Sequence, residues 1–348
     1  MTMKFLISGL GSIGRRHFRN LVALGETHIT LHRTHLATLS DDELAGYPVE
    51  TNLAAALAQH PDAVFITNPT ALHMEVAIPA AEAGCHLFLE KPISHTLEGL
   101  DRLQAAVQKN NRQVLVGFQF RYHPGLRQVK AWLEMDAIGT PISARAHWGE
   151  YLPNWHPWED YKQGYAARPD LGGGVVRTLT HPLDYLRWLL GEVSAVWALT
   201  SSTGLNMPVE DNAEIGLRFA TGALGSVHLD YNQQPPTHTL EITGTRGRIL
   251  WDNADGMARL YLHDHLGERY SPYYPMLPTK YTTNGDWLVV QPAAGFERNW
   301  MFMDQTRHFL SVLRGEAQPV CTLQDGIQAL RLALSALESA QRGVLISL

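Results

Sequence analysis

Long apolar runs and runs of one charge are both missing from this sequence of 348 residues. No apolar stretch approaches the roughly 18 residues that a membrane-spanning helix needs. No cluster of Lys and Arg marks a face for nucleic acid or anionic lipid, and the net charge of −6 is spread thinly along the chain. We therefore expect a cytoplasmic protein with neither a nucleic-acid partner nor a membrane partner.

Cysteine is also scarce. The only two, Cys85 and Cys321, are too few for a disulfide framework and lack the spacing of a metal site. The chain opens on a strand and a glycine-rich turn, so we expect no signal peptide. These features predict a reducing environment and no bound metal.

The sequence does have an ordinary globular composition, with 45% hydrophobic and 18% charged residues, and length for about two domains. Apolar strands alternate with helical segments up to about residue 120 and predict a parallel sheet. Beyond it, turn signals separate at least six strands that read as an antiparallel meander. We expect an α/β protein. Residues 1–121 form a Rossmann-type dinucleotide-binding domain, and residues 122–348 form an α/β domain with a large open, mainly antiparallel sheet.

A glycine-rich turn lies between the first strand, residues 5–8, and a helix predicted over residues 15–24. Its sequence is Gly9-Leu10-Gly11-Ser12-Ile13-Gly14. Glycines at this spacing let the backbone turn tightly and approach a pyrophosphate, which binds at the helix N-terminus. The turn predicts a dinucleotide site.

The end of the next strand, residues 28–32, bears on the choice of cofactor. NAD-binding units place an acidic residue near this point for the ribose 2′-hydroxyl. Here Arg33 and Thr34 follow His32, and no carboxylate occurs before Asp41. This arrangement favours NADP and leaves NAD possible. The alternative is that Arg33 only covers a surface turn.

Glu90-Lys91-Pro92 closes another predicted strand, residues 85–89. Ligands of open α/β sheets bind outside the carboxyl ends of the strands. The Lys91 ammonium could there donate a proton to a substrate, with Glu90 holding it in place. An ordinary strand exit with a surface ion pair is the alternative reading.

The second domain begins with a loop rich in aromatic residues, 151–171, which includes Trp158. Its rings could stack on a sugar or simply pack the loop onto the domain. Three glycines, residues 172–174, then lead to His181 and Asp184.

Taken together, these motifs resemble the Gfo/Idh/MocA oxidoreductases over essentially the whole chain. The marks are the glycine turn, Glu90-Lys91-Pro92, Gly117-Phe118-Gln119-Phe120-Arg121, and the three glycines followed by His181 and Asp184. The resemblance implies an NAD(P)-dependent enzyme acting on sugars or polyols, with a sheet that mediates dimers or tetramers. It implies Lys91 and His181 as catalytic residues. Relatives similar in residues 155–174 occur in nonulosonate or surface-sugar biosynthesis.

The candidate site residues follow from these motifs. Cofactor binding is assigned to Gly9, Gly11, Ser12, Ile13, Gly14, Arg33, Thr34, Asn68, Pro69, His73, Glu90, Lys91 and Gln119. Substrate binding is assigned to Lys91, Arg121, Tyr122, Trp158, Arg177 and His181.

One position departs from the resemblance. Many members carry an Asp four residues before the catalytic His, where this chain has Arg177. On a continuous helix Arg177 and His181 would share a face, although Pro182 makes that continuity conditional. An Arg there favours an anionic substrate. The alternative is that Arg177 pairs with Asp184 or Glu159.

The function expected is an NADP-preferring dehydrogenase or reductase of a sugar-like alcohol or ketone, acting on an acidic sugar or nucleotide sugar. Two other functions stay open on the same fold. One is a non-catalytic NADP-binding sensor, and the other is an aldose–aldose oxidoreductase with a tightly held cofactor. A homodimer or homotetramer is expected.

Overall fold

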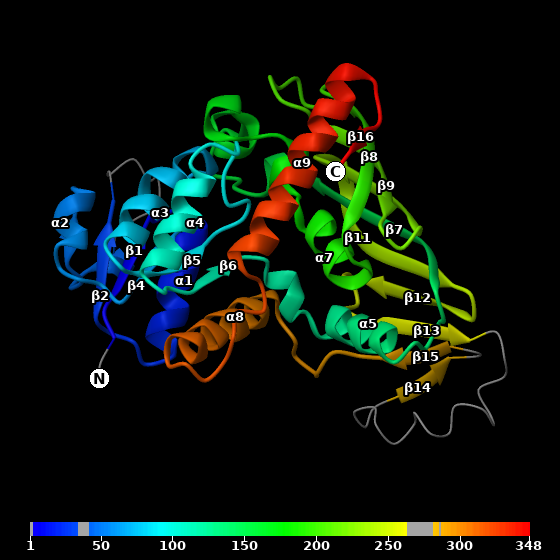
Figure 1. Cartoon of the computed structure of the whole chain (residues 1–348), viewed down its shortest axis with the longest axis horizontal. Coiled ribbons are helices and arrows are strands. Elements are labelled where there is room, and N and C mark those ends of the chain that lie inside the picture. The colour runs from blue at the N-terminus through cyan, green and yellow to red at the C-terminus, as the bar shows by residue number, and fades with distance from the viewer. Residues whose placement is uncertain (1–2, 34–41, 263–280, 285–286) are drawn as a thin grey trace. The chain divides into compact units, whose positions relative to one another are not determined.

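The computed structural model describes residues 3–33, 42–262, 281–284 and 287–348 (Figure 1). The chain forms two compact units. The first contains residues 1–119, 168–173 and 298–331, and the second contains residues 120–167, 174–297 and 332–348.

The first unit contains a six-stranded sheet in the order β3-β2-β1-β4-β5-β6. All of its pairings are parallel. Its strands are β1 (Phe5–Ser8), β2 (Ile29–His32), β3 (Val49–Glu50), β4 (Ala63–Ile66), β5 (His86–Leu89) and β6 (Val114–Val116). β1 and β4 are buried along their whole length, as expected for strands covered on both faces. The predicted Rossmann-type sheet is confirmed.

Helices flank this sheet. They are α1 (Ser12–Ala23), α2 (Leu53–Leu57), α3 (His73–Glu82), α4 (Leu100–Lys109), α8 (Arg298–Leu313) and the start of α9 (Leu323–Arg342). Helix α1 contacts α8, and α3 contacts α4 (Figure 1). Short 3₁₀ turns are η1 (Asp42–Leu44) and η2 (Thr70–Leu72), and η7 (Pro169–Leu171) also belongs to this unit.

Two helices of the first unit start without a side-chain cap. Thr70 does not cap a helix, because it begins the 3₁₀ turn η2 and α3 starts only at His73. Thr96 does not cap α4, which starts at Leu100 after Gly99 in the left-handed conformation at φ +78°. A glycine takes up that conformation without steric cost, so it sets the helix start in place of a hydroxyl cap.

The second unit contains a ten-stranded sheet in the order β14-β15-β13-β12-β11-β7-β10-β9-β8-β16 among the described residues. Its strands are β7 (Pro141–Tyr151), β8 (Val193–Ser201), β9 (Asn212–Phe219), β10 (Leu224–Asp230), β11 (Asn232–Gly244), β12 (Gly247–Asp252), β13 (Ala258–Leu262), β14 (Tyr281–Asn284), β15 (Trp287–Val290) and β16 (Ile346–Ser347).

The sheet is mainly antiparallel as expected, and the predicted meander holds for β8 to β10 and for β11 to β13, but it is interrupted between β10 and β11. β7 lies between β10 and β11, and it pairs with β10 in parallel and with β11 antiparallel. β10 and β11 follow each other in sequence, but β7, from earlier in the chain, lies between them in the sheet.

Helices contact this sheet on the face that carries its core. α5 (Pro124–Glu134) contacts β12 and β13, α6 (Val175–Thr178) contacts β9 and β10, and α7 (His181–Leu190) contacts β7. The remaining 3₁₀ turns are η3 (Gln119–Tyr122), η4 (Leu152–Asn154), η5 (Tyr161–Gln163) and η6 (Tyr165–Ala167). None of the described helices combines the length and hydropathy required to span a membrane.

By strand alternation, the other face of the sheet carries a mixed set of side chains. Trp197 and Leu199 on β8 are 40% and 55% exposed. His147 and His228 on β7 and β10 are partly exposed on the same face. We call this the outer face of the second unit.

Candidate active site

The glycine turn of the first unit packs closely on itself and on the segment that follows β4. Gly9 has φ +97°, and a Cβ there would lie 2.4 Å from the Asn68 nitrogen. At Gly14 a Cβ would lie 1.9 Å from the Gly9 oxygen. Thr67 Oγ1 donates a hydrogen bond to the Gly9 oxygen at 2.6 Å. The protein's own packing therefore requires glycine at positions 9 and 14.

Gly11 is different, and it provides a test of whether a dinucleotide fits. A Cβ at Gly11 would meet no protein atom within 4 Å, so protein packing gives no reason for a glycine there. Gly11 is also the N-cap of α1, where no side chain caps the helix and no acidic residue lies in the first turn. Unfilled space over open amide groups at a helix N-terminus suits a pyrophosphate. The residues present fit a nicotinamide dinucleotide, with Gly11, Ser12 and Ile13 at its phosphates.

The ends of β1 and β2 lie beside this turn. Ser8 Oγ lies 2.8 Å from His32 Nδ1, and the Gly9 amide donates to the His32 oxygen at 3.1 Å. Arg33 follows β2 directly and is 8% exposed. Its amide donates to the Glu50 oxygen at 3.1 Å. Thr34, the other predicted contact to the ribose phosphate, lies outside the described residues.

The loop after β4 carries the next predicted contacts. Asn68 Nδ2 donates to the Leu72 oxygen at 2.9 Å, while its Oδ1 is buried with no hydrogen-bond partner among the described residues. His73 Nε2 donates to the Asn68 oxygen at 2.9 Å, and burial lowers the pKa of His73. Pro69 is half-buried in the same loop, and Gln119 is buried beyond β6. The buried His73 side chain thus stabilises the loop, whereas Asn68 Oδ1 is a hydrogen-bond acceptor without a partner among the described residues, beside the glycine turn.

Glu90 and Lys91 follow β5, at the carboxyl edge of the sheet. Glu90 is 5% exposed, and its Oε1 accepts a hydrogen bond from His17 Nε2 at 2.7 Å. Its Oε2 accepts from the Lys91 amide at 3.1 Å. Glu90 therefore ties the Lys91 backbone to helix α1 through His17, and the Lys91 side chain is half-buried.

His17 is a residue that sequence reasoning missed. Its ring packs on Phe88 with a centroid distance of 4.5 Å and on Phe65 at 5.5 Å. A lone His on the apolar face of a helix gives no signal of its own, because its carboxylate partner comes from a strand far along the chain.

The second unit holds His181 at the start of α7, which is 1% exposed. Its ring contacts Phe120 at 4.9 Å and Trp148 at 5.4 Å between centroids. Trp148 in turn stacks on His238 at 4.4 Å. The rings of Phe120 and Trp148 thus hold the His181 imidazole in place.

Arg121 and Tyr122, both predicted to bind substrate, are buried in this unit. Arg121 pairs with Asp184, from Nε to Oδ2 at 3.0 Å and from Nη2 to Oδ1 at 2.6 Å. The Tyr122 ring lies under the Arg127 guanidinium at 4.9 Å. The Arg121–Asp184 pair ties the segment after Gln119 to helix α7, which carries His181, and gives Arg121 a structural partner.

Arg177 and His181 do not share a continuous helix. α6 ends at Thr178 and α7 begins at His181, so the conditional placement on one helix face is wrong. Arg177 is half-buried, and its charge favours the ionised form of Glu210, although burial raises the pKa of Glu210 overall. Glu210 also accepts from the Val176 amide at 3.2 Å. Glu210 is a second residue that the sequence did not reveal.

Part of the aromatic loop packs onto the second unit, which is one of the two interpretations considered for it. Trp155 packs on Tyr231 at 5.7 Å between centroids, and Tyr161 donates to the Leu205 oxygen at 3.2 Å. Trp158 is 60% exposed. Trp155 and Tyr161 pack the loop onto its unit, whereas stacking of Trp158 on a sugar stays a prediction.

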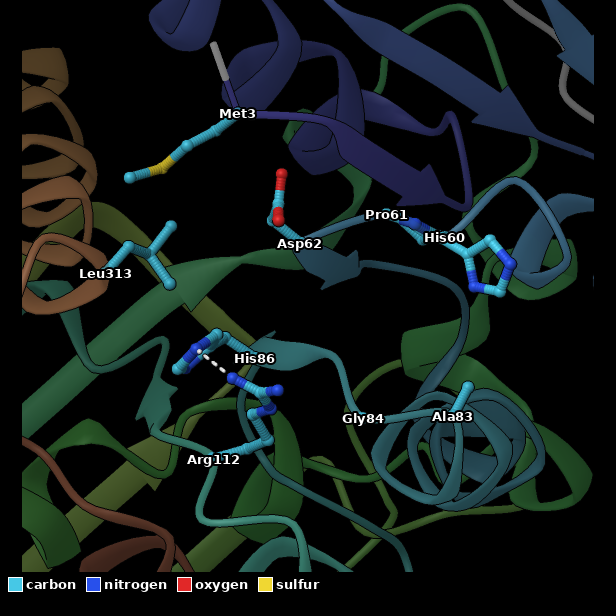
Figure 2. A pocket seen from close by; sticks show the side chains of 9 residues that line it. All are labelled: Met3, His60, Pro61, Asp62, Ala83, Gly84, His86, Arg112 and Leu313. Atoms are coloured by element: carbon cyan, nitrogen blue, oxygen red, sulfur yellow. Dashed lines mark hydrogen bonds between the residues drawn. The ribbon is translucent and has the colours of Figure 1, made fainter. Parts of the chain in front are cut away.

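The first unit also has a hollow whose lining includes Asp62, His86 and Arg112 (Figure 2). Asp62 and His86 on its wall flank the amino ends of β4 and β5, and Arg112 Nη1 lies 3.2 Å from His86 Nε2. Open α/β sheets bind ligands at the carboxyl ends of their strands. The hollow is thus at the wrong edge of the sheet for the cofactor.

Comparison with known proteins agrees with this geometry. Residues 3–118 match the family described as "Oxidoreductase family, NAD-binding Rossmann fold" and residues 126–250 match the "GFO/IDH/MocA C-terminal domain". Levoglucosan dehydrogenase of Pseudarthrobacter phenanthrenivorans is 27% identical over 328 residues, which cover 85% of this chain and 83% of that protein.

Two solved structures share the fold. Levoglucosan dehydrogenase in complex with NADH and levoglucosan has a TM-score of 0.84 at 22% identity, covering 100% of this chain and 99% of that one. The WlbA dehydrogenase from Bordetella pertussis in complex with NADH and UDP-GlcNAcA has a TM-score of 0.80 at 22% identity, with the same coverage. Both structures contain NADH. With both of its domains matched, the chain belongs to the Gfo/Idh/MocA family of NAD(P)-dependent oxidoreductases.

Proposed function

We propose that this protein is an NADP-preferring dehydrogenase or reductase of a sugar-like alcohol or ketone, with an acidic sugar or nucleotide sugar as its substrate. The observation that carries the proposal is the contrast within the glycine turn. Gly9 and Gly14 are required by packing, whereas Gly11 leaves unfilled space over the N-terminus of α1. A dinucleotide phosphate bound at the helix N-terminus would occupy that space.

The preference for NADP rests on Arg33. Arg33 is the first residue after β2, and no carboxylate stands between it and Asp41 in the sequence. An Arg at this point suits a 2′-phosphate, and a carboxylate would suit a free ribose hydroxyl. The NADH found in structural relatives makes NAD the competing cofactor.

The chemistry divides between the cofactor and the protein. A bound nicotinamide would accept or donate the hydride. The Lys91 ammonium would donate a hydrogen bond to the reacting oxygen and stabilise the alkoxide charge that develops on it. His181 would take or give the hydroxyl proton, held in orientation by Phe120 and Trp148. Asn68, Pro69, His73, Glu90 and Gln119 would shape the cofactor side of the site.

The acidic substrate rests on Arg177, which this chain has at a position where an Asp would be expected. A guanidinium binds a carboxylate or phosphate through two parallel hydrogen bonds. The UDP-GlcNAcA found in the WlbA structure is an example of an acidic nucleotide sugar bound by this fold. Trp158 supplies an exposed ring for stacking on a sugar face.

A homodimer or homotetramer built on the outer face of the second unit belongs to the same proposal. Trp197, Leu199 and Leu224 on that face are 40%, 55% and 57% exposed. Apolar surface of this kind is typically covered by a second copy.

The cofactor preference is tested by kcat/KM for NADP and NAD on the native enzyme and on Arg33→Gln. We expect the native enzyme to favour NADP by at least about tenfold. The variant should lose roughly 1.5–3 kcal/mol of NADP binding and little of NAD binding. Arg102→Gln serves as a control, because Arg102 is exposed and pairs with Glu82. Equal use of both cofactors by the native enzyme would contradict the NADP preference.

A further inference from the structure

Strand register places four polar side chains in neighbouring positions on the outer face. His228 on β10 is opposite Glu214 on β9 and beside His147 on β7. Asp230 comes two residues after His228 and therefore points to the same side. Trp148, which follows His147, and Leu229, which follows His228, point to the core instead and are 4% and 0% exposed. The cluster thus lies on the opposite face of the sheet from Trp148 and His181.

Three of these side chains direct donor atoms toward one another. His228 Nε2 lies 3.0 Å from Asp230 Oδ2, and His147 Nε2 lies 3.9 Å from the same oxygen. One donor atom from each of the three residues lies within 4.8 Å of the other two. Ligands of a tetrahedral zinc ion are separated by about 3.4 Å, as follows from metal–ligand bonds of about 2.0–2.1 Å. Small side-chain movements would bring all three atoms to that spacing.

Hydrogen bonds from neighbouring groups orient the atoms that could bind a metal. Glu214 Oε1 accepts a hydrogen bond from His228 Nδ1 at 2.6 Å. With the ring proton on Nδ1, the lone pair of Nε2 is directed at Asp230. A carboxylate on the far nitrogen is the usual partner of a metal-binding imidazole. Asp230 Oδ1 accepts from the Asn232 amide at 2.8 Å, which leaves Oδ2 facing both imidazoles.

Gly149 makes room for the cluster. A Cβ at Gly149 would lie 2.4 Å from Asp230 Oδ2 and 2.1 Å from Gln233 Oε1. Gln233 Oε1 lies 2.7 Å from His147 Nε2 and is one more oxygen that could bind a metal ion. Glycine at this position lets the carboxylate and the amide meet the imidazoles over the strand.

We propose that His147, His228 and Asp230 bind one divalent transition-metal ion of the zinc class on the outer face of the second unit. Two imidazole nitrogens and a carboxylate are donors that such ions prefer, and they leave a coordination position for Gln233 or water. The competing occupant of the same place is a proton on His228, held between the carboxylates of Glu214 and Asp230. The site uses none of the residues assigned to the cofactor or substrate.

The test is calorimetric titration of the chelator-treated full chain with Zn²⁺, repeated with Co²⁺ and read by its visible absorption. The variants are His147→Ala, Asp230→Asn and Glu214→Gln, with His28→Ala as a matched control on an exposed His of the first unit. Melting temperatures show that each variant is folded.

We expect one saturable metal ion per chain. Loss of His147 or Asp230 should weaken binding by about 100-fold or more, and Glu214→Gln should weaken it by about 10-fold or more. The Co²⁺ absorption should disappear in His147→Ala and persist in His28→Ala. Absence of saturable binding would overturn the proposal and favour the proton. Binding that survives in both His147→Ala and Asp230→Asn would also overturn it, because the metal would then be held elsewhere.

Discussion

The Arg121 guanidinium and the Asp184 carboxylate form a two-point ion pair, with N–O distances of 3.0 and 2.6 Å and side chains 2% and 1% exposed. Asp184 lies on α7, three residues after His181, and Arg121 lies two residues after Gln119. The pair therefore joins the helix that carries the proposed proton-transfer residue to the segment that follows a proposed cofactor contact. We expect the pair to hold His181 in position.

Removing one partner of this pair should be costly. Asp184→Asn leaves the buried guanidinium without its counter-charge, and we expect a loss of about 3–5 kcal/mol in the free energy of unfolding. Glu82→Gln removes the carboxylate of an exposed pair with Arg102 and should cost far less, because water screens an exposed ion pair. Urea unfolding of the two variants makes the comparison. Similar losses in the free energy of unfolding would show that the buried pair stabilises the protein no more than the exposed pair.

The glycine turn gives two alanine variants with opposite expected effects. Gly11→Ala should keep the native melting temperature, since no protein atom lies near the new Cβ. It should weaken cofactor binding about tenfold or more, equivalent to about 1.4 kcal/mol. Gly14→Ala should lower the melting temperature, because its Cβ would meet the Gly9 oxygen. Differential scanning fluorimetry with and without NADPH separates the effects. Undiminished cofactor binding by Gly11→Ala would place the phosphates elsewhere.

Stability should depend on pH through His123. Burial lowers the pKa of His123 to about 4. Its Nδ1 accepts hydrogen bonds from the Gly125 amide at 3.0 Å and from Trp251 Nε1 at 3.2 Å, so the folded state favours the neutral ring. The unfolded chain takes up the proton near pH 6.5. Stability is therefore retained above pH 6.5 and lost as the pH falls toward 4, by about 2 kcal/mol at pH 5.

His123→Asn provides the control for this effect, because the amide keeps an acceptor for the Gly125 amide and does not titrate. Between pH 7 and pH 5 the variant should lose about 2 kcal/mol less stability than the native protein in urea unfolding. An identical pH dependence in the two proteins would show that protonation of His123 does not cause the loss of stability.

Arg177 should discriminate acidic from neutral substrates. Arg177→Gln is expected to lower kcat/KM on a keto-sugar acid by roughly 2 kcal/mol or more relative to its neutral analogue, because only the acid loses a charge-assisted contact. Paired steady-state assays with the same cofactor make the comparison. Equal losses on both compounds would assign Arg177 to the structure around Glu210.

The parallel sheet could be predicted because its strands are buried on both faces. Residues 5–7 and 63–66 are apolar without alternation, and they are followed by Ser8-Gly9 and by Thr67-Asn68. The order of the second sheet could not be predicted in this way. Turn signals show that two strands follow each other, but they do not show that β7 lies between them.

Side-chain partnerships between distant segments were equally hidden. The sequence pointed to Asp184, but only the fold shows that its carboxylate meets Arg121. His17 with Glu90, and His147 with His228, come from different elements and share no spacing rule. The break between Arg177 and His181 did have a signal, because Pro182 lies one residue into α7.

We propose that this chain transfers hydride with Lys91 at the reacting oxygen. The most direct test of this proposal is NADPH oxidation on a panel of keto-sugars and their acids by the native protein, Lys91→Ala, and Lys109→Ala as an exposed control. We predict turnover by the native and control proteins. Lys91→Ala should fall by about 100-fold or more while its NADPH affinity stays nearly unchanged. Near-normal turnover by Lys91→Ala, or native protein that binds NADPH and turns over no compound in the panel, would contradict the account.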